Sequence, residues 1–247
     1  MPEDAKATGV TQLSLSPLRR KPRNCPDEVQ RSWARYVATH QSVSGLFDTF
    51  NELRSAQKNP QGSIAERHRD LVRAAIVFTA AGMDTCLRTL MEDALGTLLS
   101  RDSKARGAFK GYVLDGNKRF GGNLTNTTKK AIAALDPQAE LIGLYVQDTT
   151  AASIQSPSDL GRCRDALGLD SASLSDTKLR NHNDFFQARN EVAHELDLIE
   201  PSGKGTRGRR HRVVTAVGRQ CDEALTLVAE FITATAKTVR STQRPSH

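Results

Sequence analysis

The segment 71–99 is the feature that most limits what this chain can fold into, because its apolar side chains occupy nearly every face of a helix. A helix on a protein surface shows one apolar stripe, whereas a helix that is apolar all round has to be covered on all sides. We therefore expect a helix over 64–99, capped by Ser63, at the centre of a helical bundle. Three charged residues interrupt its apolar surface, share one broad face and need partners there: Arg73, Asp84 and Arg88.

Two further segments have helical periodicity and can pack against the central one. From Asp27, a good N-cap residue, an amphipathic pattern runs to about Gln57 and predicts one long helix, or two helices broken near Gly45. Residues 217–240 carry apolar positions at helical spacing and predict the closing helix. Good helix formers dominate these segments and only 5% of the residues are aromatic, so we expect an all-α fold.

The remainder of the chain is less regular. Residues 101–172 contain the turn-rich stretch VLDGNKRFGGNLTN and short helical patterns near 127–135 and 157–167, which predict an irregular insertion between core helices. A third long helix is expected to begin at Ser175 or Asp176 and to end near Leu196. The stretch EPSGKGTRGRRHR then predicts a basic loop or hairpin before the last helix.

The two ends of the sequence differ in composition from the helical part. Residues 1–26 contain four prolines and the basic cluster RRKPR, which indicate a flexible arm. A solvated tail is the favoured interpretation of this arm, and a segment that binds nucleic acid is the alternative. We expect a single helical domain over 27–240, followed by a tail over 241–247, and a hydrophobic content of 38% is enough for its core.

Charge and cysteine content narrow the possible partners and sites. The formal net charge of +7 would attract polyanions such as nucleic acid or acidic membranes. The four cysteines include no close pair, which argues against a zinc site or a disulfide framework and favours reduced thiols. No signal pattern opens the sequence, and the longest charge-free apolar stretch, 74–83, is too short to span a bilayer. We expect a cytoplasmic protein that does not enter a membrane.

The stretch ARNEVAHELD, residues 188–197, carries the candidate catalytic residues. It places Arg189 and Asn190 side by side on the expected third helix, with His194 on the next turn. An arginine and a histidine at similar spacing also occur at 35–40 and 240–247, so the spacing alone proves little. Only the pair at 189–194 has an amide directly after the arginine and a long helical context. A polar helix face paired with neighbouring charges is the alternative interpretation.

The segment FFQARNEVAHELD resembles the signature of the HEPN superfamily, an arginine, a polar residue and then a histidine on a late helix. The segment RAAIVFTAAGMDTCLRTLMEDAL is similar to the long central helix of HEPN proteins of the RiboL-PSP type, in which an acidic residue often stands at the place of Asp84. SDLGRCRDALGLD also fits that group. The resemblance covers roughly residues 64–99 and 155–200, and it implies an all-α bundle of HEPN type.

The resemblance also implies an activity. Many HEPN proteins are metal-independent endoribonucleases that act as toxins or in defence against phage, and they commonly form homodimers in which two motifs face one another. His194 would then exchange protons during attack by the RNA's 2′-OH, and Arg189 would stabilise charge on the phosphate. Asn190 would orient the phosphate or the imidazole, and Asp84 would either position Arg189 or form a plain structural salt bridge. No metal or cofactor is expected.

One departure from the family pattern concerns the protein partner. Some HEPN toxins have a tyrosine two places after the histidine, which a partner nucleotidyltransferase modifies, but here that place is Leu196. Inactivation by that route is therefore not expected, although another antitoxin or defence-system partner protein is compatible with the sequence.

The basic loop supplies the candidate RNA contacts. Its cations lie on a Gly-rich segment without aromatic residues, which suits backbone phosphates better than base stacking. They are Lys204, Arg207, Arg209, Arg210 and Arg212. A solvated loop is the alternative. For the whole chain, two other functions remain open beside an RNase: a catalytically inactive HEPN-like module that binds nucleic acid or a partner protein, and an unrelated helical scaffold.

Overall fold

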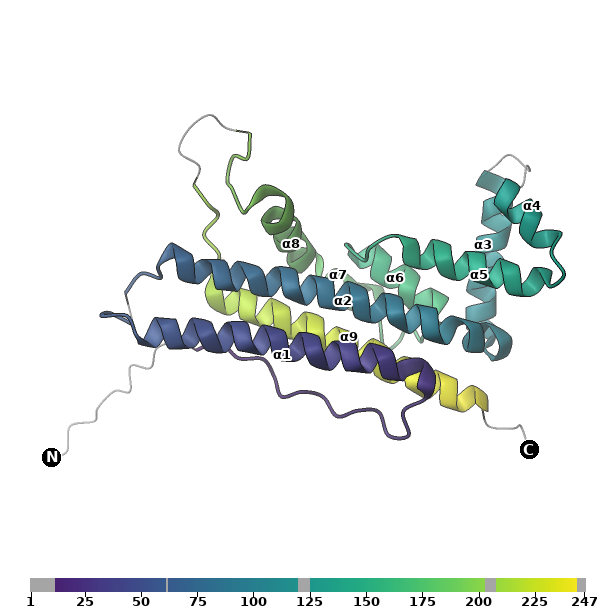
Figure 1. Ribbon diagram of the computed structural model, residues 1–247, viewed down its shortest axis with the longest axis horizontal. Coiled ribbons are helices and arrows are strands. Elements are labelled where there is room, and N and C mark those ends of the chain that lie inside the picture. Colours follow the sequence, from purple (N-terminus) through teal and green to yellow (C-terminus); the bar gives the residue numbers. More distant parts are fainter. Residues whose placement is uncertain (1–11, 61, 120–124, 203–207, 244–247) are drawn as a thin grey trace.

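The computed structural model describes residues 12–60, 62–119, 125–202 and 208–243, and within them the fold is all-α (Figure 1). Three long helices lie side by side and form the body of the molecule: α1 (Asp27–Ser55), α2 (Glu66–Arg101) and α9 (Val214–Gln243). Helix α2 packs against both of the others, and its inner face is fully buried. The prediction of a helical bundle around the central apolar segment is confirmed.

The largest buried side chains come from all three long helices. Phe47 and Phe50 of α1 and Phe231 of α9 lie beside the aliphatic side chains of α2, and none is more than 1% exposed. Helix α1 is continuous through Gly45, so the sequence alternative of two helices is not realised. Helices α1 and α2 approach closely at Gly82, where an added Cβ atom would overlap the side chain of Thr39.

Helix α2 is also long and apolar enough to cross a membrane by length and composition alone. Just over half of the relevant window is buried inside the protein, as in the core helix of a soluble bundle. Packing against α1 and α9 covers part of its apolar surface.

Between α2 and the motif helix the chain is more helical than the sequence predicted. The expected short pieces exist as α4 (Asn126–Ile132) and α6 (Pro157–Ala166), but α3 (Ser103–Arg119) and α5 (Pro137–Ala151) are regular helices as well. Tyr112 packs against Tyr145, with ring centroids 4.9 Å apart, and this contact joins α3 to α5. Contacts of this kind outweigh the turn-forming composition of the segment. Helices α3 and α4 lie at one end of the bundle, and α5 runs back from there alongside α2 (Figure 1).

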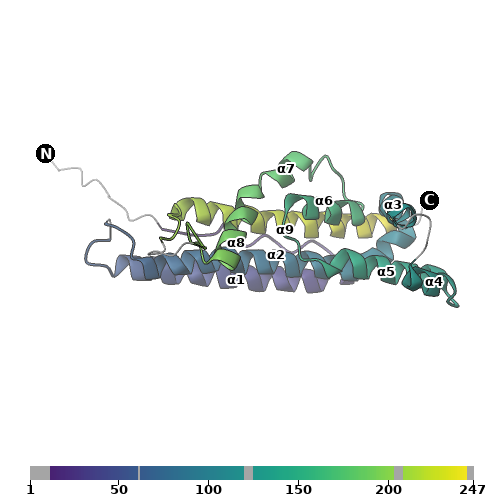
Figure 2. The ribbon, with the colours of Figure 1, turned by 90° about the horizontal axis from the view of Figure 1, so that it is seen from above.

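The expected third long helix is divided in two. A short helix, α7 (Asp176–Arg180), is followed by a break at Asn181 and His182 and then by α8 (Asn183–Glu195), which carries the motif. Helix α8 lies across α2 and also contacts α9 (Figure 2). The following segment forms an isolated antiparallel bridge between Leu198 and Arg209, in agreement with the predicted loop or hairpin.

Residues 12–26, which we call the N-terminal strap, are bound to the bundle, and for them the expectation of a flexible arm is wrong. Leu13 is 4% exposed, and its backbone exchanges hydrogen bonds of 2.8 and 2.7 Å with the side chain of Asn51 on α1. The backbone N–H and the hydroxyl of Ser16 donate to Asp222 on α9, each over 2.7 Å. The strap therefore lies along the seam between α1 and α9. Residues 1–11 and 244–247 fall outside the described residues.

Candidate active site

Helix α8 holds the motif in place because apolar residues just before the motif are anchored in the core. Phe185, Phe186 and Ala188 are each at most 3% exposed and hold the helix against the bundle. Beyond Glu195 the chain turns sharply, with Leu196 and Asp197 in the left-handed backbone region at φ of 51° and 60°. This turn fixes where the motif helix ends, one residue after His194.

Arg189 and Asn190 form one polar unit on α8. Arg189 is half-buried, and its Nη1 donates to the side-chain oxygen of Asn190 over 2.8 Å. Within the described residues no carboxylate lies at ion-pair distance from Arg189. The guanidinium therefore keeps N–H donors for an anionic ligand, and a guanidinium fork matches the oxygens of a phosphate.

His194 is exposed and has no hydrogen bond or ion pair with any described residue. Its position five residues after Arg189 places the two side chains about 140° apart around the helix. No hydrogen bond joins them among the described residues. A single chain thus presents the two groups on different faces of α8, and both remain available to other molecules.

Asp84 occupies a different environment from the one needed to position Arg189. Its Oδ1 accepts a hydrogen bond of 2.7 Å from the backbone N–H of Ile154, and its Oδ2 lies 3.6 Å from Nη1 of Arg88. In the described part of the chain, nothing connects Asp84 to Arg189. The structure therefore favours the plain salt bridge over the positioning role for Asp84, which holds the segment before α6 on α2.

The partner of Arg73 is Asp197, a residue that the sequence interpretation missed. Asp197 is fully buried, and Nε of Arg73 donates to its Oδ2 over 2.8 Å. Arg212 donates to the same carboxylate over 2.5 Å and 3.1 Å. We call Arg73, Asp197 and Arg212 the buried ion cluster. Because Asp197 lies two residues beyond the end of α8, the cluster fixes the motif helix to α2.

The described arginines of the basic loop are engaged within the chain. Arg209 pairs with Asp70, and Arg210 lies 3.1 Å from Glu195. Arg212, besides its contact with Asp197, lies 2.7 Å from Glu191. Carboxylates of the same chain therefore neutralise these three arginines in part, which leaves less of their charge for backbone phosphates. Lys204 and Arg207 lie outside the described residues.

The surrounding charges lower the pKa of Glu191. Burial alone would raise it, but hydrogen bonds from Arg212 and Gln187 and the charge of Arg210 outweigh burial. Burial lowers the pKa of His182, at the start of α8, with Glu230 opposing and Lys178 reinforcing the shift. Titratable groups with shifted pKa values therefore lie at the start of the motif helix and within it.

The described residues contain no group of three histidine, cysteine or acidic side chains placed to hold a metal ion. Three of the four cysteines are buried, and burial raises the pKa of Cys86 and Cys221 to about 12, so their thiols are neutral and poor nucleophiles. The motif residues of α8 themselves offer a guanidinium, an amide and an imidazole.

Comparison of the chain with protein-family models, with curated proteins and with solved structures finds no match. The fold and the site define an all-α bundle with an accessible Arg-Asn-x3-His motif on a short helix that crosses the central one.

Proposed function

We propose that this chain is a HEPN-like, metal-independent endoribonuclease, with Arg189, Asn190 and His194 as its catalytic residues. The observation that supports this most is the state of Arg189. The neighbouring arginines, Arg73 and Arg212, are paired with carboxylates, whereas the side-chain hydrogen bond of Arg189 to a described residue goes to the amide oxygen of Asn190. A half-buried guanidinium without a counter-ion attracts an anion such as a phosphodiester.

The proposed reaction is an intramolecular transesterification. His194 accepts the proton of the ribose 2′-OH while O2′ bonds to phosphorus and the bond from phosphorus to O5′ breaks. Arg189 stabilises the negative charge that develops on the non-bridging oxygens, and Asn190 orients the guanidinium. A histidine then returns the proton to O5′. The products are a 2′,3′-cyclic phosphate and a 5′-hydroxyl end.

A homodimer would bring these groups together, because one chain has Arg189 and His194 on different faces of α8. A two-fold axis beside α8 and α2 would supply a second arginine and a second histidine to the same phosphate. Helix α2 leaves Phe78 53% exposed, and Ala81, three residues later on the same face, is exposed too. We propose that this apolar surface belongs to the dimer interface.

The catalytic proposal is tested by incubating the protein with mixed RNA in EDTA and analysing the ends of the products. We expect cyclic phosphate ends, and a loss of about 10² to 10⁴ in rate for His194→Ala. Arg189→Ala should also abolish cleavage, whereas the matched control His211→Ala, at another exposed histidine, should cleave normally. RNA binding without any cleavage would instead support a catalytically inactive module.

The dimer is tested by mixing two inactive variants. Subunits with Arg189→Ala and subunits with His194→Ala should recover part of the activity when combined, because a mixed dimer contains one intact copy of each group. Phe78→Asp should dissociate the dimer in light scattering and reduce cleavage. A monomeric protein with full activity would exclude a shared site.

The cellular role that fits this activity is a toxin or an anti-phage defence effector, controlled by a protein partner. Induced expression should arrest growth, and the His194→Ala variant should not. Normal growth on expression of an RNase-active wild-type chain would argue against this role.

A further inference from the structure

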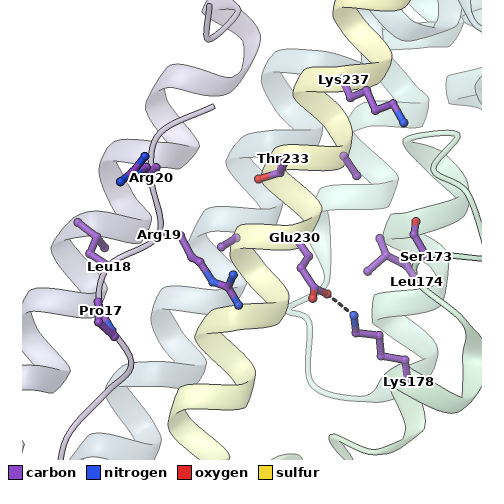
Figure 3. Close-up of a pocket in the computed structure, with 12 residues that line it drawn as sticks. Pro17, Leu18, Arg19, Arg20, Ser173, Leu174, Lys178, Glu230, Thr233 and Lys237 are labelled. Carbon is purple, nitrogen blue, oxygen red and sulfur yellow. Dashed lines mark ion pairs between the residues drawn. The ribbon is translucent and has the colours of Figure 1, made fainter. Parts of the chain in front are cut away.

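A groove with a volume of about 770 Å³ lies between the N-terminal strap and the region of α7, away from the motif residues (Figure 3). Its floor is the outer face of α9, including Glu230, Thr233 and Lys237. One wall is the strap at 17–20, and the other is formed by 173–174 and by Lys178 of α7. A volume of this size is in the range that accommodates an extended small ligand or part of a polymer.

The charges around the groove are predominantly positive. Four of its lining residues are cations, and the only lining carboxylate, Glu230, lies 2.6 Å from the ammonium group of Lys178. Figure 3 shows this pair within the groove and the guanidinium of Arg19 directed toward α9. Neither Arg19 nor Lys237 has a carboxylate at ion-pair distance among the described residues. The groove therefore has an excess of positive charge after its internal pair is counted.

This arrangement differs from that of the basic loop. There the described arginines contact carboxylates of the same chain, whereas Arg19 of the strap and Lys237 of α9 have no counter-ion in the part of the chain that the structure describes. No aromatic side chain lines the groove, so it offers no stacking surface for bases. A polyanion held by its backbone, rather than by its bases, fits these features.

The groove also has a defined relation to the motif helix. Lys178 belongs to α7, and His182, which precedes the first residue of α8, follows four residues later. His194 lies about 18 Å further along, at 1.5 Å per helical residue. A strand in the groove would thus be bound near the opposite end of α8 from the motif histidine.

We propose that the groove binds the phosphate backbone of single-stranded RNA, as a second contact separate from the motif residues. The identity of the polyanion as RNA rests on the proposed function, whereas its negative charge follows from the groove itself. Arg19 and Lys237 contact phosphates. Lys178 is partly neutralised by Glu230 and contributes less.

Binding is measured by fluorescence anisotropy in EDTA with a 2′-O-methylated oligonucleotide, which lacks the attacking hydroxyl and cannot be cleaved. The double variant Arg19→Gln/Lys237→Gln is compared with Lys129→Gln/Lys130→Gln, which removes the same charge from exposed positions on α4. We expect the groove variant to lose about tenfold in affinity at 50 mM salt. Its log–log salt slope should fall by about 1.4, since each single-strand phosphate contact contributes about 0.7.

A third variant changes the groove in the opposite direction. Glu230→Gln removes the carboxylate that neutralises Lys178, so it should tighten binding and steepen the salt slope by about 0.7. Unfolding cannot mimic a gain in affinity. All variants are first compared by their urea unfolding midpoints.

The outcomes separate this inference from the proposed function. Weaker oligonucleotide binding by the Arg19→Gln/Lys237→Gln variant supports the proposal that the groove binds RNA, even if the wild-type chain cleaves no RNA. Equal affinity and salt slope in the groove and control variants overturn it, even if the wild-type chain cleaves RNA. Competition by poly-glutamate as effective as that by the oligonucleotide would also overturn it, because the groove would then be a site for acidic peptides.

Discussion

Substitution of Asp197 is expected to reduce stability strongly, although the importance of this residue was not apparent from the sequence. The change Asp197→Asn preserves the size of the side chain. Asparagine, like aspartate, also tolerates the left-handed backbone observed at this position. It removes the negative charge that Arg73 and Arg212 share at a position with no exposure.

The expected loss of stability depends on which carboxylate partners Arg73 and Arg212 keep in the variant. Removing one partner of a buried ion pair costs about 3 to 5 kcal/mol, since the other charge stays buried without compensation. Arg73 still has Glu66 at 2.7 Å, and Arg212 still has Glu191 at 2.7 Å, so the lower end applies. We expect a loss of about 3 kcal/mol in the free energy of unfolding, or roughly 6 to 12 °C in Tm.

The measurement is urea unfolding followed by circular dichroism at one fixed protein concentration, because dissociation of a dimer would make the midpoint depend on concentration. The control is Glu195→Gln, which removes a carboxylate from the half-exposed pair with Arg210 and should cost about 0 to 1 kcal/mol. A loss below 1 kcal/mol for Asp197→Asn would refute the view that the buried ion cluster fixes the motif helix to α2.

Three further predictions concern other parts of the fold. Gly82→Ala should destabilise the protein by about 1 to 3 kcal/mol in the same assay, because the new methyl group overlaps Thr39; an unchanged midpoint would contradict the close approach of α1 and α2. Leu196→Gly should stabilise it by about 1 kcal/mol, since Leu196 is exposed and has a φ of 51°. Burial lowers the pKa of His182 in the folded state. Below about pH 6.5 the unfolded chain therefore binds a proton at this residue that the folded chain does not bind. The free energy of unfolding should consequently fall as the pH decreases from about 6.5 toward the folded-state pKa. The His182→Gln variant should show a weaker dependence of the free energy of unfolding on pH in that window. An unchanged pH dependence would exclude His182 as its cause.

The sequence predicted the parts of the fold that depend on local periodicity. The central helix and its two long neighbours were recognised because their apolar residues recur at helical spacing, and Gly45 does not interrupt α1. Helices α3 and α5 were missed because their packing joins Tyr112 to Tyr145, which are far apart in the sequence. The strap was misjudged for the same reason, since its prolines suggested mobility while its hydrogen bonds lead to α1 and α9.

The candidate site shows the same division. The order and spacing of Arg189, Asn190 and His194 were readable from the sequence, and the structure places them on one helix as expected. The pairing of Arg73 with the buried carboxylate was not readable, because Asp197 lies 124 residues away in the sequence, beyond the local partners Glu66 and Asp70. The need of Arg73 for a partner was the available signal, yet nothing in the local pattern of Asp197 distinguished it from other acidic residues.

The strap has a consequence for the order in which the protein is completed during translation. Residues 12–26 leave the ribosome early, but Ser16 and Arg23 are bound by Asp222 and Arg240 of α9. At about 5 to 20 residues per second, some 10 to 45 s pass before α9 has been synthesised. The wall of the groove that carries Arg19 can therefore form only after α9 has been synthesised, so a nascent chain lacks this cationic surface until that helix has folded.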